Sequence, residues 1–116
     1  MTLILVVDDS ALIRKVLERL LAEQGLETLA FARAESASDI DIASVGAAIL
    51  DIEIEDQSGI ELGRSLLERD PSLPVSFLTG TTDPTLIREA RALGPVFEKG
   101  DDLTPAALWA GTTARR

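Results

Sequence analysis

The stretch AAILDIEIEDQSG, residues 47–59, is the most informative part of this chain for predicting its fold and its site. A short apolar run ends at Asp51, and three more acids follow at Glu53, Glu55 and Asp56. An apolar run of this length that ends in a carboxylate predicts a buried parallel strand, which delivers Asp51 to the edge of a sheet. Like charges crowded at such an edge repel one another unless something positive binds among them. The stretch therefore predicts a site for a cation.

Length and composition set the outer limits. The chain has 116 residues, 46% of them hydrophobic and 27% charged, which is ordinary for a globular protein. A chain of this size is large enough for a core and too small for two, so we expect a single domain over residues 1–116 with no output domain. The apolar run Leu3 to Val7 is too short for a membrane span or a signal peptide. We therefore expect a cytoplasmic protein.

Two residue types are missing and the charge is strongly negative. The chain has no cysteine, which excludes disulfides and thiolate chemistry, and no histidine, which excludes an imidazole base and a phosphohistidine of its own. A net charge of −9 argues against nonspecific binding to nucleic acid and against docking on an anionic membrane. Hard cations with oxygen ligands are the natural small partners.

Hydrophobic periodicity predicts five strands that alternate with helices. The expected strands are Leu3–Val7, Glu27–Ala32, the strand that ends at Asp51, Leu73–Leu78 and Val96–Glu98. The expected helices are one from Ala11 that Gly25 ends, a short one with Ala37, Ile40 and Ala43 on one face, Gly59–Arg69, Pro84–Leu93 capped by Asp83, and one from Thr104 with a frayed tail over Gly111–Arg116. Such alternation predicts an α/β fold, a doubly wound five-stranded parallel sheet with helices on both faces.

Residues with useful chemistry follow four of the five expected strands. Asp8 and Asp9 follow the first strand, Asp51 the third, Thr79 the fourth and Lys99 the fifth. Because ligands bind outside the carboxyl ends of strands in such sheets, we expect these side chains to meet at one edge.

Each of these residues also has an ordinary explanation. Asp8-Asp9 alone is more often a helix cap, and Thr79-Gly80 is a turn signal. Lys99 is more telling, because the chain has two lysines against nine arginines and a compact charge suits a pocket. The coincidence at four strand ends favours a site for phosphoryl transfer.

The motifs VVDDS at 6–10, LDIEIEDQSG at 50–59, FLTG at 77–80 and FEKG at 97–100 resemble the receiver domain of two-component response regulators. This CheY-like family has a flavodoxin-like fold, and the resemblance covers nearly the whole chain. It implies the strand order 2-1-3-4-5. It also implies that the chain takes a phosphoryl group from a phosphohistidine donor, switches a protein-interaction surface and then dephosphorylates itself, without being a conventional enzyme.

The resemblance assigns roles to single residues. Asp51 matches the phosphoacceptor, with Gly59 eight residues later allowing the turn into the next helix. Asp8 and Asp9 match the acid pair that binds Mg²⁺ together with the acceptor, and Glu53 would lend its backbone carbonyl to the same ion. Thr79 matches the switch hydroxyl, and Lys99 matches the lysine that binds the phosphoryl group.

The resemblance also implies partners. A histidine kinase or a histidine phosphotransfer protein would be the donor, docking near the first helix, and an unidentified protein effector would receive the signal. No direct contact with nucleic acid or membrane is expected. A homodimer through the fourth helix, the fifth strand and the fifth helix is a further option.

Three positions depart from the family pattern. Glu55 stands four residues after the acceptor, where receivers usually have proline, and Gly100 follows the lysine in place of another proline. Val96 occupies the place of the rotating aromatic three residues before the lysine, and Phe97 is one residue out of register. These departures speak against the usual aromatic relay of activation.

Two alternatives remain open on the sequence. One is a non-phosphorylated pseudo-receiver that serves only as an interaction module, which the departures favour and the intact acids and lysine oppose. The other is a phosphatase of the haloacid-dehalogenase-like class. That class places its nucleophile after the first strand in a DxD pattern, whereas this chain reads Asp8-Asp9-Ser10 and has no cap domain.

Overall fold

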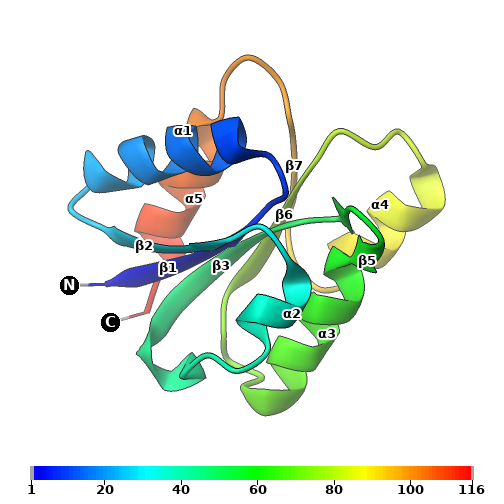
Figure 1. Cartoon of the computed structure of the whole chain (residues 1–116), viewed down its shortest axis with the longest axis horizontal. Helices are drawn as coiled ribbons and strands as arrows, with labels where there is room; N and C mark the ends of the chain where they lie inside the picture. Colours follow the sequence, from blue (N-terminus) through cyan, green and yellow to red (C-terminus); the bar gives the residue numbers. More distant parts are fainter. Residues whose placement is uncertain (1, 116) are drawn as a thin grey trace.

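A computed structural model describes residues 2–115 and contains a five-stranded parallel sheet (Figure 1). Across the sheet the strands are β2 (Glu27–Phe31), β1 (Leu3–Val7), β3 (Val45–Asp51), β6 (Val75–Thr79) and β7 (Val96–Glu98). Two further strands, β4 (Glu53–Ile54) and β5 (Gln57–Ser58), form a separate antiparallel hairpin. Since β6 and β7 are thus the fourth and fifth strands of the main sheet, the predicted order 2-1-3-4-5 is confirmed.

Helices cover both faces of this sheet (Figure 1). One face carries α1 (Ala11–Ala22) and α5 (Thr104–Thr113); the other carries α2 (Ala34–Ala37), α3 (Gly59–Arg69) and α4 (Pro84–Arg91), with a 3₁₀ turn η1 (Ile42–Ser44) before β3. Within residues 2–115, none of the helices is both long and apolar enough to cross a membrane.

The central strand β3 divides the core into two layers. All seven of its residues are buried, as the continuous apolar run predicts for a strand covered on both faces. Ala48 and Leu50 pack into the cluster under α2, α3 and α4, whereas Ala47 and Ile49 pack under α1 and α5. The alternation follows from the two-residue period of a strand and fixes the direction of Asp51 at its end.

The helix starts follow their capping residues. The Ser10 hydroxyl accepts a hydrogen bond from Ile13 N, Ser58 caps α3, and Asp83 caps α4 ahead of Pro84. The bounds of α3 agree with the prediction. After α1, Gly25 has φ of 76°, the left-handed conformation that the sequence predicts there. The helix itself ends earlier, at Ala22, and α4 ends at Arg91 rather than Leu93.

The prediction of one short helix with Ala37, Ile40 and Ala43 on a single face is wrong. Helix α2 is only one turn long, η1 is a separate turn, and Ala43 is exposed. Two hydroxyls explain the break, because Ser38 Oγ donates to Glu35 O and Ser44 Oγ donates to Asp41 O, both at 2.7 Å. Such local bonds compete with helix propagation.

Strand β6 starts two residues later than predicted and includes Thr79. Pro74 has no N–H to donate, and pairing with β3 begins only at Val75, opposite Ala48. Thr79, expected in a loop, is therefore the buried last residue of β6.

The prediction of a frayed tail is also wrong as far as the structure describes it; Arg116 lies outside the described residues. Helix α5 continues to Thr113, and Arg115 then binds three other segments. Its guanidinium donates to Val45 O at 3.2 Å, to Ile42 O at 3.3 Å and to Ser72 Oγ at 2.9 Å, and it pairs with Asp70 Oδ2 at 2.6 Å. The sequence pattern of the tail carries no sign of these distant carbonyl partners.

We predict that Arg115→Gln lowers the melting temperature by several degrees. We also expect the melting temperature of the variant to change less with pH in the acid range. The bond from Arg115, followed by those from Ser72, lowers the pKa of Asp70 from 3.8 to about 2. A lowered carboxyl pKa stabilises the fold fully above the ordinary value and loses that contribution as the pH falls toward the lowered one. Thermal melts of both proteins across this range should show the difference shrinking in acid. A difference independent of pH would contradict the role of Asp70.

Candidate functional site

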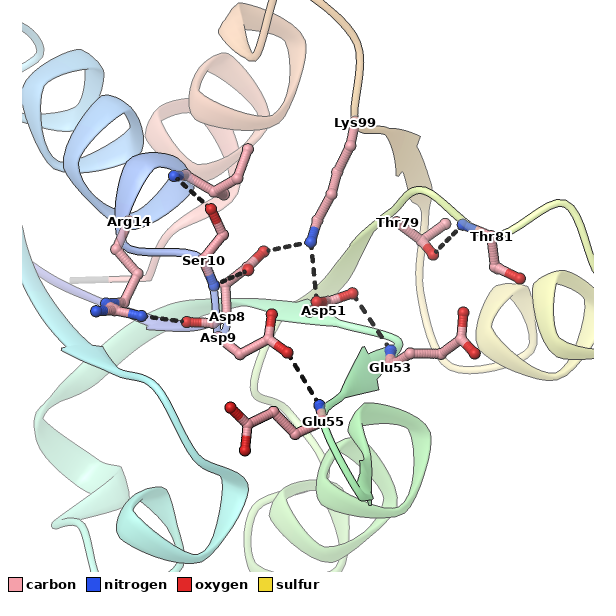
Figure 2. A network of polar contacts seen from close by, with 11 residues as sticks. Asp8, Asp9, Ser10, Arg14, Asp51, Glu53, Glu55, Thr79, Thr81 and Lys99 are labelled. Atoms are coloured by element: carbon pink, nitrogen blue, oxygen red, sulfur yellow. Dashed lines mark hydrogen bonds and ion pairs between the residues drawn. The ribbon is translucent and has the colours of Figure 1, made fainter.

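Two aspartates end neighbouring strands of the sheet and lie side by side. Asp8 follows β1 and Asp51 is the last residue of β3; their side chains are 2% and 5% exposed. In parallel strands the carboxyl ends share one edge, and the register Val7 opposite Leu50 brings these two acids together (Figure 2). The sequence prediction that they meet is confirmed.

Lys99 lies between the two acids. Its Nζ is 2.9 Å from Asp8 Oδ2 and 2.9 Å from Asp51 Oδ2. Its backbone N donates to Thr79 O at 2.8 Å, which continues the pairing of β6 with β7 and fixes where the side chain starts. Burial acts to lower the pKa of the Lys99 ammonium, but its bonds to Asp51 and Asp8 outweigh burial, so the pKa is raised. Lys99 therefore stays charged between the acids.

The environment of Asp51 disfavours its ionised form. Burial raises the pKa of the Asp51 carboxyl, the bond from Lys99 works in the opposite direction, and the nearby charge of Asp8 adds to the rise. One lysine thus does not fully offset the burial of two carboxylates. A second positive charge beside the two carboxylates would offset the remaining cost of burying them.

Asp8 is not the cap of α1, which the ordinary explanation suggested, and its side chain is held in place. Its Oδ1 accepts from Ser10 N at 2.9 Å, its backbone carbonyl accepts from Arg14 Nη1 at 2.7 Å, and Ser10 is the residue that caps α1. Its Oδ2 is buried, and its partner among the described residues is the Lys99 ammonium at 2.9 Å. A buried carboxylate oxygen with one such partner still has a lone pair that can bind a cation.

Asp9 completes an acidic cluster that fits a divalent metal. Asp8, Asp9 and Asp51 each offer a carboxylate oxygen, and these oxygens lie within 4.8 Å of one another. Oxygen ligands of this charge suit Mg²⁺ or Ca²⁺. This set of oxygen donors thus fits the predicted ion.

The residues after Asp51 form the hairpin β4–β5, which is absent from the strands predicted by the sequence. Ile52 and Ile54 are buried, whereas Glu53 and Glu55 are exposed. This alternation of apolar and acidic residues has the two-residue period of a strand. It is the sequence signal from which the hairpin could have been predicted. Glu53 N donates to Asp51 Oδ1 at 3.2 Å; the role of its carbonyl toward a metal stays a prediction.

Gly59 is needed for a different reason from the expected turn. A Cβ at this position would lie 1.6 Å from the carbonyl oxygen of Asp51, and Gly59 N donates to Ile52 O at 2.8 Å. Only a residue without a side chain allows α3 to start this close to the end of β3. Gly59 therefore helps to fix the backbone of Asp51.

Thr79 lies on the β6 side of the cluster (Figure 2). It is 3% exposed, and its Oγ1 accepts a hydrogen bond from Thr81 N at 2.9 Å. In the part of the chain that the structure describes, no hydrogen bond joins its hydroxyl to Asp51 or Lys99. Sequence and structure therefore agree on its place at this edge, and its hydroxyl hydrogen is available to a group bound beside Asp51.

The two residues at the predicted aromatic position point to opposite faces of the sheet. Val96 packs against the cluster under α4, whereas Phe97 packs under α5. The ring of Phe97 lies 6.4 Å from that of Trp109, centroid to centroid, at an interplanar angle of 56°. Phe97 thus cannot replace the aromatic that the family pattern places at 96.

Comparison with known proteins identifies one family. The model of the response regulator receiver domain matches residues 4–96. Among curated proteins, the transcriptional regulatory protein TdiR of Thauera aromatica is 34% identical over 88 residues, 75% of this chain and 39% of the relative. The response regulator protein TmoT of Ectopseudomonas mendocina is 28% identical over 93 residues, 78% of this chain and 42% of the relative. The chain thus spans about two fifths of the length of these relatives.

Solved structures show the same fold. The response regulator protein TrrA of Thermotoga maritima, solved in complex with Mg²⁺ and BeF, superposes with a TM-score of 0.85 at 24% identity and covers 97% of this chain and 99% of its own. A response regulator receiver protein of Pseudoalteromonas atlantica reaches a TM-score of 0.76 at 27% identity, with 84% of each chain covered.

We predict that Gly59→Ala destabilises the protein by roughly 1–3 kcal/mol, because the new methyl group overlaps the Asp51 carbonyl. Gly80→Ala is the matched control, since a Cβ at Gly80 meets nothing within 4 Å. Denaturant unfolding of both variants measures the effect. Equal stability of the two variants would contradict the close approach at Gly59.

We also predict that Asp51→Asn raises the melting temperature at neutral pH in the absence of divalent metal. The folded state raises the pKa of Asp51, so the carboxylate form opposes folding above its unfolded pKa, and asparagine removes that charge. Thermal melts in a chelator test this. A lower melting temperature would mean that the bond from Lys99 stabilises the Asp51 carboxylate more than burial destabilises it.

Proposed function

Because this chain belongs to the response regulator receiver domain family, we propose that it accepts a phosphoryl group on Asp51 and passes the change to a protein partner. The observation that best supports this proposal is the position of Lys99. Its Nζ lies 2.9 Å from the carboxylates of both Asp8 and Asp51. A phosphoryl acceptor needs a nucleophile beside fixed positive charge, and this pair of contacts supplies both.

Asp51 is the nucleophile in this proposal. One of its carboxylate oxygens forms a bond to phosphorus while the bond from phosphorus to the leaving group breaks. The leaving group is an imidazole nitrogen when the donor is a phosphohistidine and a carboxylate oxygen when it is an acyl phosphate. The product is an acyl phosphate on Asp51, and later attack by water at phosphorus restores the carboxylate.

Asp8, Asp9 and Asp51 would hold Mg²⁺, with the Glu53 carbonyl as a further ligand. When bound, the ion supplies the charge that offsets repulsion between the carboxylate and the incoming phosphoryl oxygens. The three carboxylate oxygens within 4.8 Å of one another support this assignment.

Lys99 and Thr79 take the remaining phosphoryl oxygens. Lys99 would exchange its bond to Asp51 Oδ2 for one phosphoryl oxygen and keep its backbone bond to Thr79 O. The Thr79 hydroxyl would donate to another oxygen, and the hydrogen bond from Thr81 N to Thr79 Oγ1 would have to adjust. Because Thr79 ends β6 just before α4, this adjustment is where the chemical change reaches the outer surface.

A histidine kinase or a histidine phosphotransfer protein is the proposed donor, and a protein effector or a second copy of the chain is the proposed receiver of the signal. Leu12 on α1 supports a docking surface near the site, because its side chain is large, apolar and 70% exposed. The predicted absence of direct contact with nucleic acid stays a prediction.

Incubation with Mg²⁺ and acetyl phosphate, followed by intact-mass measurement, tests the function. We expect a phosphoryl adduct on the wild-type protein that disappears in Asp51→Asn and when a chelator is present. The variant is an apt control because it keeps the shape of the acceptor and removes only its charge and nucleophilicity. Wild-type protein that binds Mg²⁺ but takes no phosphoryl group from acetyl phosphate or from phosphohistidine donors would favour a pure interaction module.

A further inference from the structure

We propose that Glu55 is a positioning residue whose backbone N–H orients the Asp9 carboxylate for metal binding. This inference rests on the proposed function, since it concerns the Mg²⁺ site described there. It assigns to the tip of the β4–β5 hairpin a role in building that site.

The hydrogen bond that carries the inference joins two distant parts of the chain. Glu55 N donates to Asp9 Oδ2 at 3.0 Å, while the Glu55 side chain points away from Asp51 (Figure 2). This is the only hydrogen bond or ion pair of the Asp9 side chain among residues 2–115. Asp8 and Asp51 are buried and paired with Lys99, and Asp51 also accepts from Glu53 N in β4. Of the three acids, Asp9 is the one without the Lys99 contact, and the hairpin tip is its one described side-chain partner.

Glu55 makes this bond in an uncommon backbone conformation. Its φ is 50°, and it is the only residue other than glycine with a positive φ in the described part of the chain. For a residue with a side chain this conformation costs on the order of 1 kcal/mol, so the surrounding contacts must hold it. The strained residue lies at the acidic cluster, where such strain often serves function.

Contacts from the start of α2 hold the hairpin in place. Arg33 Nη1 is 3.1 Å from Glu55 Oε2, and Arg33 Nε is 2.7 Å from Glu35 Oε1. Gln57 Nε2 donates to Glu35 Oε2 at 3.1 Å, and Gln57 Oε1 accepts from Ala34 N at 2.7 Å. Glu55 and Gln57 of β5 are thus tied to one segment, which keeps the Glu55 N–H directed at Asp9.

The bond leaves Asp9 free to bind a metal. A carboxylate has about four lone-pair sites, and one N–H on Oδ2 occupies only one of them. Hydrogen bonds to a ligand from outside the coordination sphere fix its orientation, and their loss typically costs roughly 10–100-fold in metal affinity. Glu55 would act in this way without touching the ion.

Proline at position 55 would abolish the hydrogen bond to the Asp9 carboxylate. Proline has no N–H, and its ring fixes φ near about −65°, far from the observed 50°. Glycine would keep the N–H and accept positive φ, and it would lose only the side-chain contact with Arg33.

Isothermal titration calorimetry with Mg²⁺ alone, without any phosphoryl donor, tests the inference. We expect Glu55→Pro to weaken Mg²⁺ binding by about tenfold or more, and Glu55→Gly to stay close to wild type. Arg33→Gln should give a smaller loss, because it removes the anchor and leaves the N–H. Arg64→Gln is its control, since it deletes the same charge from an equally exposed pair with Glu61 on α3 and should leave affinity unchanged.

Equal losses in the proline and glycine variants, or no loss in either, would overturn the inference. Failure of the wild-type protein to bind Mg²⁺ would overturn the inference and the proposed metal site together. Wild-type binding and phosphorylation, with a proline variant of unchanged affinity, would overturn the inference alone.

Amide hydrogen exchange keeps the test decisive if Glu55→Pro does not fold. In the Mg²⁺-loaded wild-type protein the Glu55 amide should exchange slowly although its residue is exposed, and Asp9→Ala should remove that protection. Exchange of the wild-type Glu55 amide at the rate of an unfolded chain would overturn the inference.

Discussion

The ion pair of Lys99 with Asp8 and Asp51 is the constraint on which the site depends. Burying two carboxylates next to each other costs several kcal/mol per ion unless a cation lies between them. The ammonium can lie there only if three strand pairings hold in register: Val7 with Leu50, Asp51 with Leu78, and Thr79 with Glu98. The whole width of the sheet from β1 to β7 thus serves to place one nitrogen atom between two oxygens.

The three acids of the cluster are held in two different ways. Asp8 and Asp51 extend from buried strands, and the close approach of Gly59 to the Asp51 carbonyl fixes the backbone of Asp51. Asp9 is more exposed, and its bond to the hairpin is its one described polar contact. The orientation of Asp9 therefore depends on the hairpin tip, whereas Asp8 and Asp51 are held by the sheet and by Lys99.

The surfaces around the site differ on the two sides of β7. Toward α4 the strand presents the small side chain of Val96, and toward α5 it presents Phe97 against Trp109. A strand residue cannot change faces without a shift of register. Because Phe97 is one residue away from the position expected for the aromatic, its ring lies on the opposite face of the sheet. Within β7, the face toward α4 therefore carries no aromatic ring.

The sequence by itself determined the sheet, its strand order and the acids and lysine at its edge, because strand periodicity and strand-end residues are local signals. It also contained the alternation of Ile52 and Ile54 with acids, which predicts a strand when counted strictly. The anchoring of Arg115, the role of Gly59 and the bond from Glu55 to Asp9 were decided only by the tertiary structure. Each of these depends on where a distant or neighbouring backbone oxygen, N–H or carboxylate lies, and residue type alone does not give that position.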